Sequence, residues 1–221
     1  SPVFEVRYED GSFGCDLRYE SHIIKDGKYG LSGLPAVYEN SDMDKAQTLE
    51  ITLSDKVSGI KVILYYGIIE SLDIITRAAN VINENKNNIY IEKLQSACLD
   101  FVSGNFDLIT FYGRHAMERN FQRVPVAHGR QMVGSRRGAS SHQYNPMMIL
   151  ADEKTTEDAG CGYALSFVYS GNFQGEAQKD QFNQTRVLMG LNEEMFRYPL
   201  ETGETFYAPE VILSFTDQGL N

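Results

Sequence analysis

Alternation of apolar and polar residues along short stretches is the feature that most constrains the fold of this chain. In TLEITLSD, Leu49, Ile51 and Leu53 alternate with polar residues, and IKVILYYGII (60–69) repeats the pattern after the turn-prone SDKVSG. A period of two residues is that of a β-strand with one buried face. We therefore expect these two segments to form an antiparallel hairpin with one buried face.

Other segments extend the strand pattern over the whole chain. They are TRAANVIN, IYIEKLQSACLDF, GYALSFVYSG, TRVLMGL and FYAPEVILSF, and residues that favour turns separate them. Helical signals are weak. The two candidate segments, 41–47 and 192–196, are each long enough for only one turn. Many short strands separated by turns predict an all-β fold, a large antiparallel β-sandwich with few short helices, in one domain over 1–221.

The segment 113–146 lacks the strand pattern and carries a local excess of arginine in an acidic protein. It also holds three of the four histidines, His115, His128 and His142. We expect a long loop. Such a loop could present a surface to an anion or an acidic partner, or its arginines could pair with carboxylates elsewhere in the protein. From residue types alone, the second interpretation is favoured.

Charge and composition exclude several classes of function. The net charge is −10 and the sequence pI is about 4.9, so the surface repels phosphate backbones and anionic membranes. We expect neither a nucleic-acid nor a membrane partner. Cys15, Cys98 and Cys161 lie far apart without metal-ligand spacing, which argues against a disulfide framework or a zinc site and favours a reducing cytoplasm. Cys98 is predicted to be a small core residue. No metal or cofactor is expected.

The residues also do not indicate a catalytic site within this chain. A glycosidase needs two carboxylates facing each other across a sugar, and nothing in the spacing of the thirty acidic residues selects a pair. Ser141 and His142 are adjacent on an extended segment and lack a nucleophile elbow. Tyrosine and phenylalanine could stack on sugar rings, but the absence of tryptophan weakens the case for a dedicated carbohydrate-binding module.

A family resemblance enters at SRRGASSHQYNP (135–146). This stretch resembles a motif in the N-terminal β domain of bacterial α-galactosidases of glycoside hydrolase family 36. TTEDAGCGYALSFVYSGNF resembles the family's TEDxGxxYGFSLVYSGNF, and LETGETFYAPEVILSFTDQGLN resembles LEPGESFxTPEAVLVYSDQGLN. SPVFEVRYEDG and TLEITLSDKVSGIKVILYY also match, so the resemblance covers essentially the whole chain.

The resemblance implies a β-supersandwich of the galactose-mutarotase type, followed in the family by a (β/α)8 barrel and a small C-terminal β domain. Family members hydrolyse terminal α-linked galactose from melibiose, raffinose and related sugars with retention, using two carboxylates on the barrel. We therefore expect a fragment that lacks the first strands and the barrel and is inactive alone.

The parent enzyme is expected to be a bacterial cytoplasmic homo-oligomer, as the family often forms tetramers. The domain would contribute folding, oligomer contacts and the shape of the active-site entrance. The alternatives are a free-standing carbohydrate-binding module and a mutarotase-like enzyme.

The resemblance also suggests a role for the arginine-rich motif. We expect it to dock against the barrel or to line the rim of its cleft through Arg136, Arg137, Ser141, His142 and Asn145. The alternative is that Arg136 and Arg137 only hold the loop in place through buried ion pairs. At 113–119 the family commonly has GxWxRER, and His115 stands at the position of its tryptophan. A role of that aromatic side chain does not carry over to this chain.

Overall fold

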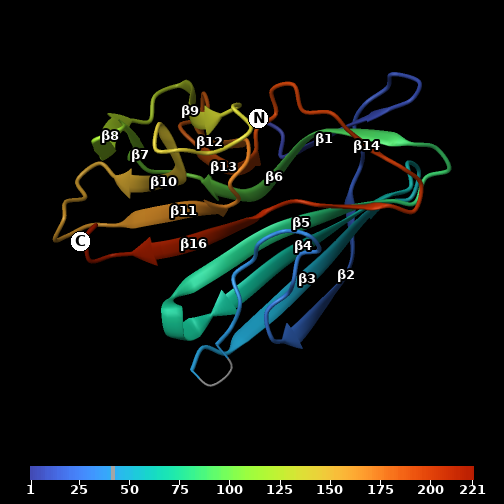
Figure 1. The fold of residues 1–221 in the computed structure, drawn as a ribbon, viewed down its shortest axis with the longest axis horizontal. Helices are drawn as coiled ribbons and strands as arrows, with labels where there is room; N and C mark the ends of the chain where they lie inside the picture. Colours follow the sequence, from blue (N-terminus) through green and yellow to red (C-terminus); the bar gives the residue numbers. More distant parts are fainter. Residues whose placement is uncertain (41–42) are drawn as a thin grey trace.

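The computed structural model describes residues 1–40 and 43–221, and in this part of the chain the strands form two antiparallel sheets (Figure 1). The five-stranded sheet has the order β1 (Phe4–Tyr8), β6 (Ile89–Phe101), β13 (Thr185–Leu191), β12 (Phe173–Lys179), with β14 (Tyr198–Leu200) also paired to β6. The ten-stranded sheet has the order β2 (Arg18–Asp26), β3 (Ala46–Asp55), β4 (Ile60–Ile69), β5 (Ile74–Asn83), β16 (Glu210–Thr216), β11 (Gly162–Val168), β10 (Tyr144–Asp152), β7 (Phe106–Arg114), β8 (Met117–Pro125), with β15 (Thr205–Tyr207) also paired to β5. The prediction of an all-β antiparallel sandwich is confirmed.

Two apolar clusters lie between the sheets. The first joins β6, β12 and β13 to β7, β10, β11 and β16 and includes Phe173, Met148 and Leu165, and the second joins β1, β6 and β14 to β4 and β5 and includes Ile91 and Val81. Each fully buried side chain of this size stabilises the fold by about 1.5–3 kcal/mol relative to its exposed state. We call them the first core and the second core.

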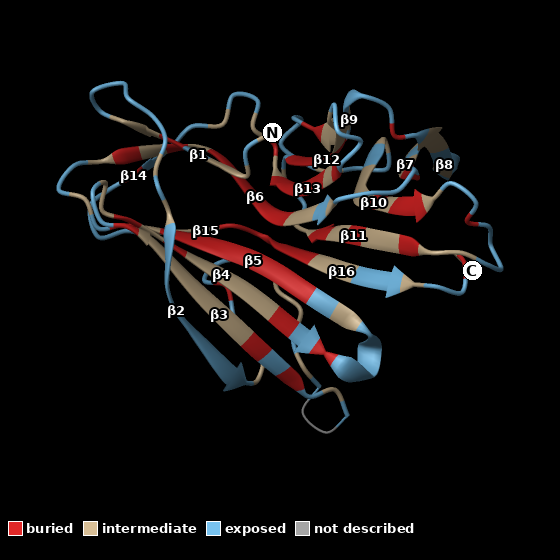
Figure 2. Ribbon diagram, turned by 180° about the vertical axis from the view of Figure 1, so that it is seen from behind, coloured by how far each residue is buried: buried red, intermediate tan, exposed pale blue. Residues whose placement is uncertain are grey.

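The ten-stranded sheet extends beyond the five-stranded one. Figure 1 shows β2, β3 and β4 running away from the smaller sheet, and Figure 2 shows β2 exposed along its length. β2 is an edge strand, and all of its residues are exposed.

The predicted hairpin is confirmed, since β3 pairs with β4 from Ala46↔Ile69 to Asp55↔Ile60. Its turn requires glycine, because Gly59 has φ +67° and a Cβ there would lie 2.9 Å from the Asn85 backbone nitrogen. The prediction of a single buried face is wrong. Ile60 is buried on the inner face, but Ile68 on that face is 48% exposed and Ile69 on the outer face is buried.

Ile69 is buried and Ile68 is exposed because the ten-stranded sheet extends beyond the five-stranded one. Beyond the end of the smaller sheet, the inner face of β4 has no covering layer. On the outer face, the segment 27–39 covers the strands instead, and Tyr29 and Leu31 pack there with Tyr65 and Ala78 in a third apolar cluster.

Three other sequence-based expectations need correction. A helical turn is predicted at 41–47, but Ala46 and Gln47 begin β3, and Ser41 and Asp42 lie outside the described residues. A helical turn is also predicted at 192–196, but this segment forms a hydrogen-bonded turn rather than a helix. The helix that the structure does contain among its described residues is one 3-10 turn, η1 (Glu70–Leu72). Cys98 is only partly buried, because its neighbours Ala97 and Leu99 face the first core.

The predicted loop at 113–146 instead contains β8, the start of β10, and β9 (Gly129–Ser135), which runs beside β12. β8 is an edge strand with mostly exposed side chains, so its sequence carries no apolar alternation. Arg123 on β8 is held by Asp107 on β7, with 2.6 Å between Nε and Oδ2, and its guanidinium also donates to the carbonyl of Thr155 at 2.6 Å. Arg123, whose residue type suggested a solvated loop, therefore holds the edge of a sheet in place.

Candidate functional site

The structure spreads the five predicted interface residues along a surface segment between β9 and β10. Arg136, Arg137, Ser141 and His142 are exposed, and Asn145 is half-buried at the start of β10. Of the five, Arg136 is the one that lines a cleft of about 780 Å³ beside this segment.

We call this cavity the aromatic cleft. Four aromatic side chains line it, Tyr169, Phe196, Tyr198 and Phe206, together with the polar residues Arg136, Asn172, Asn192 and Glu194 and the residues Gly138, Gly171, Leu191 and Met195. The polar groups come from three connecting segments, whereas Tyr198 lies on β14 of one sheet and Phe206 on β15 of the other, so the cleft lies where the two sheets meet.

The aromatic wall combines residues of two strands from different sheets with residues of connecting segments. Tyr198 on β14 and Phe206 on β15 have ring centroids 4.7 Å apart, and Phe196 lies 6.0 Å from Phe206. Phe196 and Phe206 pack against the second core, whereas Tyr169 packs against the first core. Tyr198 remains 40% exposed, so an aromatic surface is open to solvent at the edge of both cores.

The polar wall is formed by loops that hydrogen-bond to one another. The Gly138 N–H donates to Asn172 Oδ1 at 2.7 Å, which joins the β9–β10 connection to the β11–β12 turn. Asn192 donates to the Phe173 carbonyl at 3.2 Å and accepts from the Glu194 N–H at 3.0 Å. These bonds fix the loops before any ligand binds.

An ion pair crosses the polar wall between the Arg136 guanidinium and Glu194 Oε2. The side chains of Arg136 and Glu194 are 56% and 48% exposed, so solvent screens the pair, and such pairs are worth about 0–1 kcal/mol. The alternative of a buried ion pair is therefore not met at Arg136, because the pair is exposed in this chain. For Arg137, the structure shows a backbone N–H donated to Ser135 Oγ at 3.4 Å.

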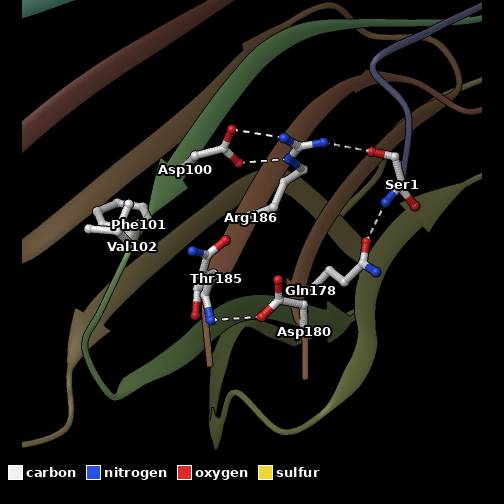
Figure 3. A pocket seen from close by; sticks show the side chains of 9 residues that line it. Ser1, Asp100, Phe101, Val102, Gln178, Asp180, Thr185 and Arg186 are labelled. Carbon is white, nitrogen blue, oxygen red and sulfur yellow. Dashed lines mark hydrogen bonds and ion pairs between the residues drawn. The ribbon is translucent and has the colours of Figure 1, made fainter. Parts of the chain in front are cut away.

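A second cavity, of about 440 Å³, lies where β6, β12 and β13 end (Figure 3). Arg186 makes a bidentate pair with Asp100, with distances of 2.7 and 2.9 Å, and Asp180 Oδ1 accepts from the Gln184 N–H at 2.9 Å. The hydrogen bonds and charge of Arg186 lower the pKa of Asp100. A carboxylate held ionised in this way is a poor general acid at neutral pH, so we assign this cluster a structural role.

One further arginine and one lysine form ion pairs on the outer face of the five-stranded sheet. Arg130 on β9 bonds Glu176 Oε2 at 2.5 Å and Glu193 Oε1 at 2.9 Å, and Lys93 on β6 also contacts Glu193. Glu176 and Lys93 are almost fully buried. For Arg123, Arg130 and Arg136, the sequence-based interpretation that arginines of 113–146 pair with carboxylates is confirmed.

Sequence reasoning did not single out the aromatic residues of the cleft. Phe196, Tyr198 and Phe206 come from a turn and two strands of three residues each, and aromatic residues in such positions are indistinguishable from core residues in sequence. The turn EEMF stands out only in the structure, where Met195 adopts φ +62° and is 97% exposed. Left-handed backbone at a bulky residue is uncommon and often marks a functional segment.

Together, the fold and the site define an all-β sandwich domain with a polar and aromatic surface cleft. Residues 1–201 match the family described as Glycosyl hydrolase family 36 N-terminal domain, and the chain belongs to this family. The described helices include none that is long and apolar enough to cross a membrane. Likewise, the described residues contain no cluster of three or more histidine, cysteine or acidic side chains suited to a metal ion.

Relatives of known activity match over almost the whole chain. The bifunctional alpha-galactosidase/sucrose kinase AgaSK of Mediterraneibacter gnavus is 56% identical over 219 residues, covering 99% of this chain and 23% of that protein. Alpha-galactosidase Mel36A of Lactobacillus acidophilus is 42% identical over 221 residues, covering 100% of this chain and 30% of that protein. The chain thus spans less than a third of the length of these relatives.

Solved structures agree with the fold. The galactosidase domain of AgaSK superposes with a TM-score of 0.95 at 54% identity, covering 99% of this chain and 30% of that one. The A355E variant of the alpha-galactosidase AgaA from Geobacillus stearothermophilus, solved with 1-deoxygalactonojirimycin, gives a TM-score of 0.96 at 41% identity, covering 99% of this chain and 30% of that one. The chain corresponds to the N-terminal β-sandwich domain of such enzymes.

Proposed function

We propose that this domain is a non-catalytic part of a retaining α-galactosidase, which removes terminal α-linked galactose from sugars of the melibiose and raffinose type. One observation carries the proposal. Almost the whole chain matches proteins named as α-galactosidases, and the matched segment is less than a third of the length of each of them. A related structure holds raffinose, which supports this substrate class. Both catalytic carboxylates then lie on a barrel outside these residues, in keeping with barrel active sites at the C-terminal face.

The carboxylates that are buried in this domain support a structural rather than catalytic role. Glu210 is bonded by Lys28, Glu176 by Arg130, and Asp55 accepts from three backbone N–H groups. The backbone donors lower the pKa of Asp55, whereas a catalytic acid needs a raised pKa.

The role of the domain is to dock against the barrel and to shape its entrance through the motif that carries Arg136, Arg137, Ser141, His142 and Asn145. Four of these side chains are exposed and available to a second surface. Asn145 Oδ1 is buried and has no hydrogen-bond partner among the described residues. This atom is enclosed by its own domain and out of reach of a docked surface, so the proposal rests on the four exposed side chains.

We also infer a homotetramer in the bacterial cytoplasm. The exposed edge strand β2 supports contacts between copies, because its unpaired backbone groups and the exposed Ile23 and Ile24 favour pairing with another strand.

Turnover of a nitrophenyl α-galactoside tests the proposal. The 221-residue chain is expected to release no nitrophenol, whereas the longer protein encoded by the same gene is expected to show turnover. Activity of the 221-residue chain that tracks the protein peak through repurification would place catalysis inside it. An inactive longer protein that is folded would refute the assignment to α-galactosidases.

A further inference from the structure

We propose that the aromatic cleft is a binding subsite for a neutral saccharide. The volume of about 780 Å³ falls within the range of about 300–1,000 Å³ that is usual for ligand sites. The choice of α-galactosides as the first ligands to test rests on the proposed function. The assignment of a neutral saccharide rests on the residues of the cleft alone.

The aromatic wall suits one face of a sugar ring. A pyranose has faces of C–H groups that pack on aromatic rings, whose faces carry partial negative charge. Tyr198 presents a ring that is 40% exposed, and Phe206 supports it at 4.7 Å between centroids. Because Phe206 packs against the second core, the platform has a rigid backing.

The charge of the cleft selects a neutral ligand. Arg136 and Glu194 are the charged residues among those that line it, and they form an ion pair. An isolated arginine would favour phosphate or carboxylate, but here Glu194 neutralises it. The pair still offers guanidinium donors beside carboxylate acceptors, which is the combination that neighbouring sugar hydroxyls require.

The walls are also ordered in advance. Asn172 Oδ1 accepts a hydrogen bond from the Gly138 N–H, and the Asn172 amide nitrogen takes part in no hydrogen bond among the described residues. The Ser140 N–H donates to the Ser170 carbonyl at 2.7 Å, which gives the same two loops a second bond. Binding groups that are held in place by other bonds lose little conformational entropy when a ligand arrives.

Titration of the 221-residue chain with melibiose and raffinose, followed by amide chemical shifts, tests the proposal. We expect saturable binding with a Kd of about 1 mM, with the shifts confined to residues that line the cleft. No saturation at about 50 mM sugar, or shifts centred elsewhere, would overturn the proposal. Sodium phosphate at the same concentrations should give no saturable shifts, and phosphate binding at Arg136 would contradict the assignment to a neutral ligand.

Matched tyrosine variants locate the site. Tyr198→Ala is expected to weaken sugar binding about tenfold, which corresponds to about 1.4 kcal/mol. Tyr112→Ala, at a tyrosine on β7 that is 44% exposed and outside the cleft, should leave the affinity unchanged. Equal effects of the two variants would refute the proposal. If Tyr198→Ala does not fold, Arg136→Gln serves instead, since its side chain is more than half exposed, and unchanged affinity in that variant would count against the cleft.

This test and the turnover test fail independently. An active longer protein with no sugar binding by the 221-residue chain removes the subsite and leaves the family function. Sugar binding in the cleft together with an inactive longer protein keeps the subsite and removes the proposed activity.

Discussion

At the scale of single residues, Asp55 shows how one carboxylate couples this fold to pH. It ends β3, and its two oxygens accept from the N–H groups of Asp16 at 2.9 Å, Val57 at 2.9 Å and Ser58 at 3.2 Å. The bond from the Asp16 backbone is the main cause that lowers the pKa of Asp55 to about 2, and the bonds from Val57 and Ser58 add to it. In the unfolded chain the pKa returns to about 3.9.

Because the folded pKa is the lower one, the ionised carboxylate stabilises the fold at pH values above about 4. This contribution disappears as the pH falls from about 4 to about 2. Asp55→Asn is expected to lower the free energy of unfolding by about 1–3 kcal/mol at pH 7. Urea unfolding at pH 7 and at pH 2.5 measures the effect, and the difference between the two proteins should shrink at the lower pH. An equal difference at both values would show that ionisation of Asp55 is not the cause.

At the scale of elements, the segment 27–39 acts as a cover on the outer face of the ten-stranded sheet, and a buried ion pair attaches it. Lys28 Nζ lies 2.5 Å from Glu210 Oε1, and their side chains are 3% and 0% exposed. Glu210 Oε2 also accepts from the Val37 N–H at 2.6 Å. The stem of Lys28 passes over Gly67, where a Cβ would lie 2.8 Å from Lys28 Cδ.

Lys28→Met should therefore destabilise the protein strongly, since it leaves Glu210 buried without its cation. The expected loss in the free energy of unfolding is about 3–5 kcal/mol. Lys25→Met is the matched control, because the Lys25 side chain is 51% exposed in its pair with Glu50, and it should cost less than about 1 kcal/mol. Urea unfolding of both variants measures the difference. Similar losses would mean that the cover is held by its apolar side chains alone.

The elements also show what could be predicted from sequence and why. Alternation identifies β3 and β4 correctly, because β4 has Ile60 and Val62 facing a core. It misses β8 and β9, because their exposed side chains need not be apolar. The aromatic cleft could not be predicted, since Tyr198 and Phe206 meet only when β14 joins one sheet and β15 the other.

At the scale of the whole molecule, the two cores are coupled by strands that serve both. β6 contributes Ala97 to the first core and Ile91 to the second, and β16, which carries Val211 of the first core, pairs directly with β5. The aromatic cleft bridges them as well, because its aromatic residues pack against both. Neither core can lose its order without releasing strands that the other needs.

We therefore expect one cooperative unfolding transition, and damage to either core should lower it as a whole. Leu150→Ala in the first core and Ile91→Ala in the second should each lower the free energy of unfolding by about 2–5 kcal/mol, because both side chains are fully buried. Thermal unfolding followed by near- and far-ultraviolet circular dichroism should give coincident curves in each variant. If Ile91→Ala instead separated an early transition from a late one, the halves of the sandwich would be independent. The cleft between them would then be a hinge rather than the rigid platform that saccharide binding requires.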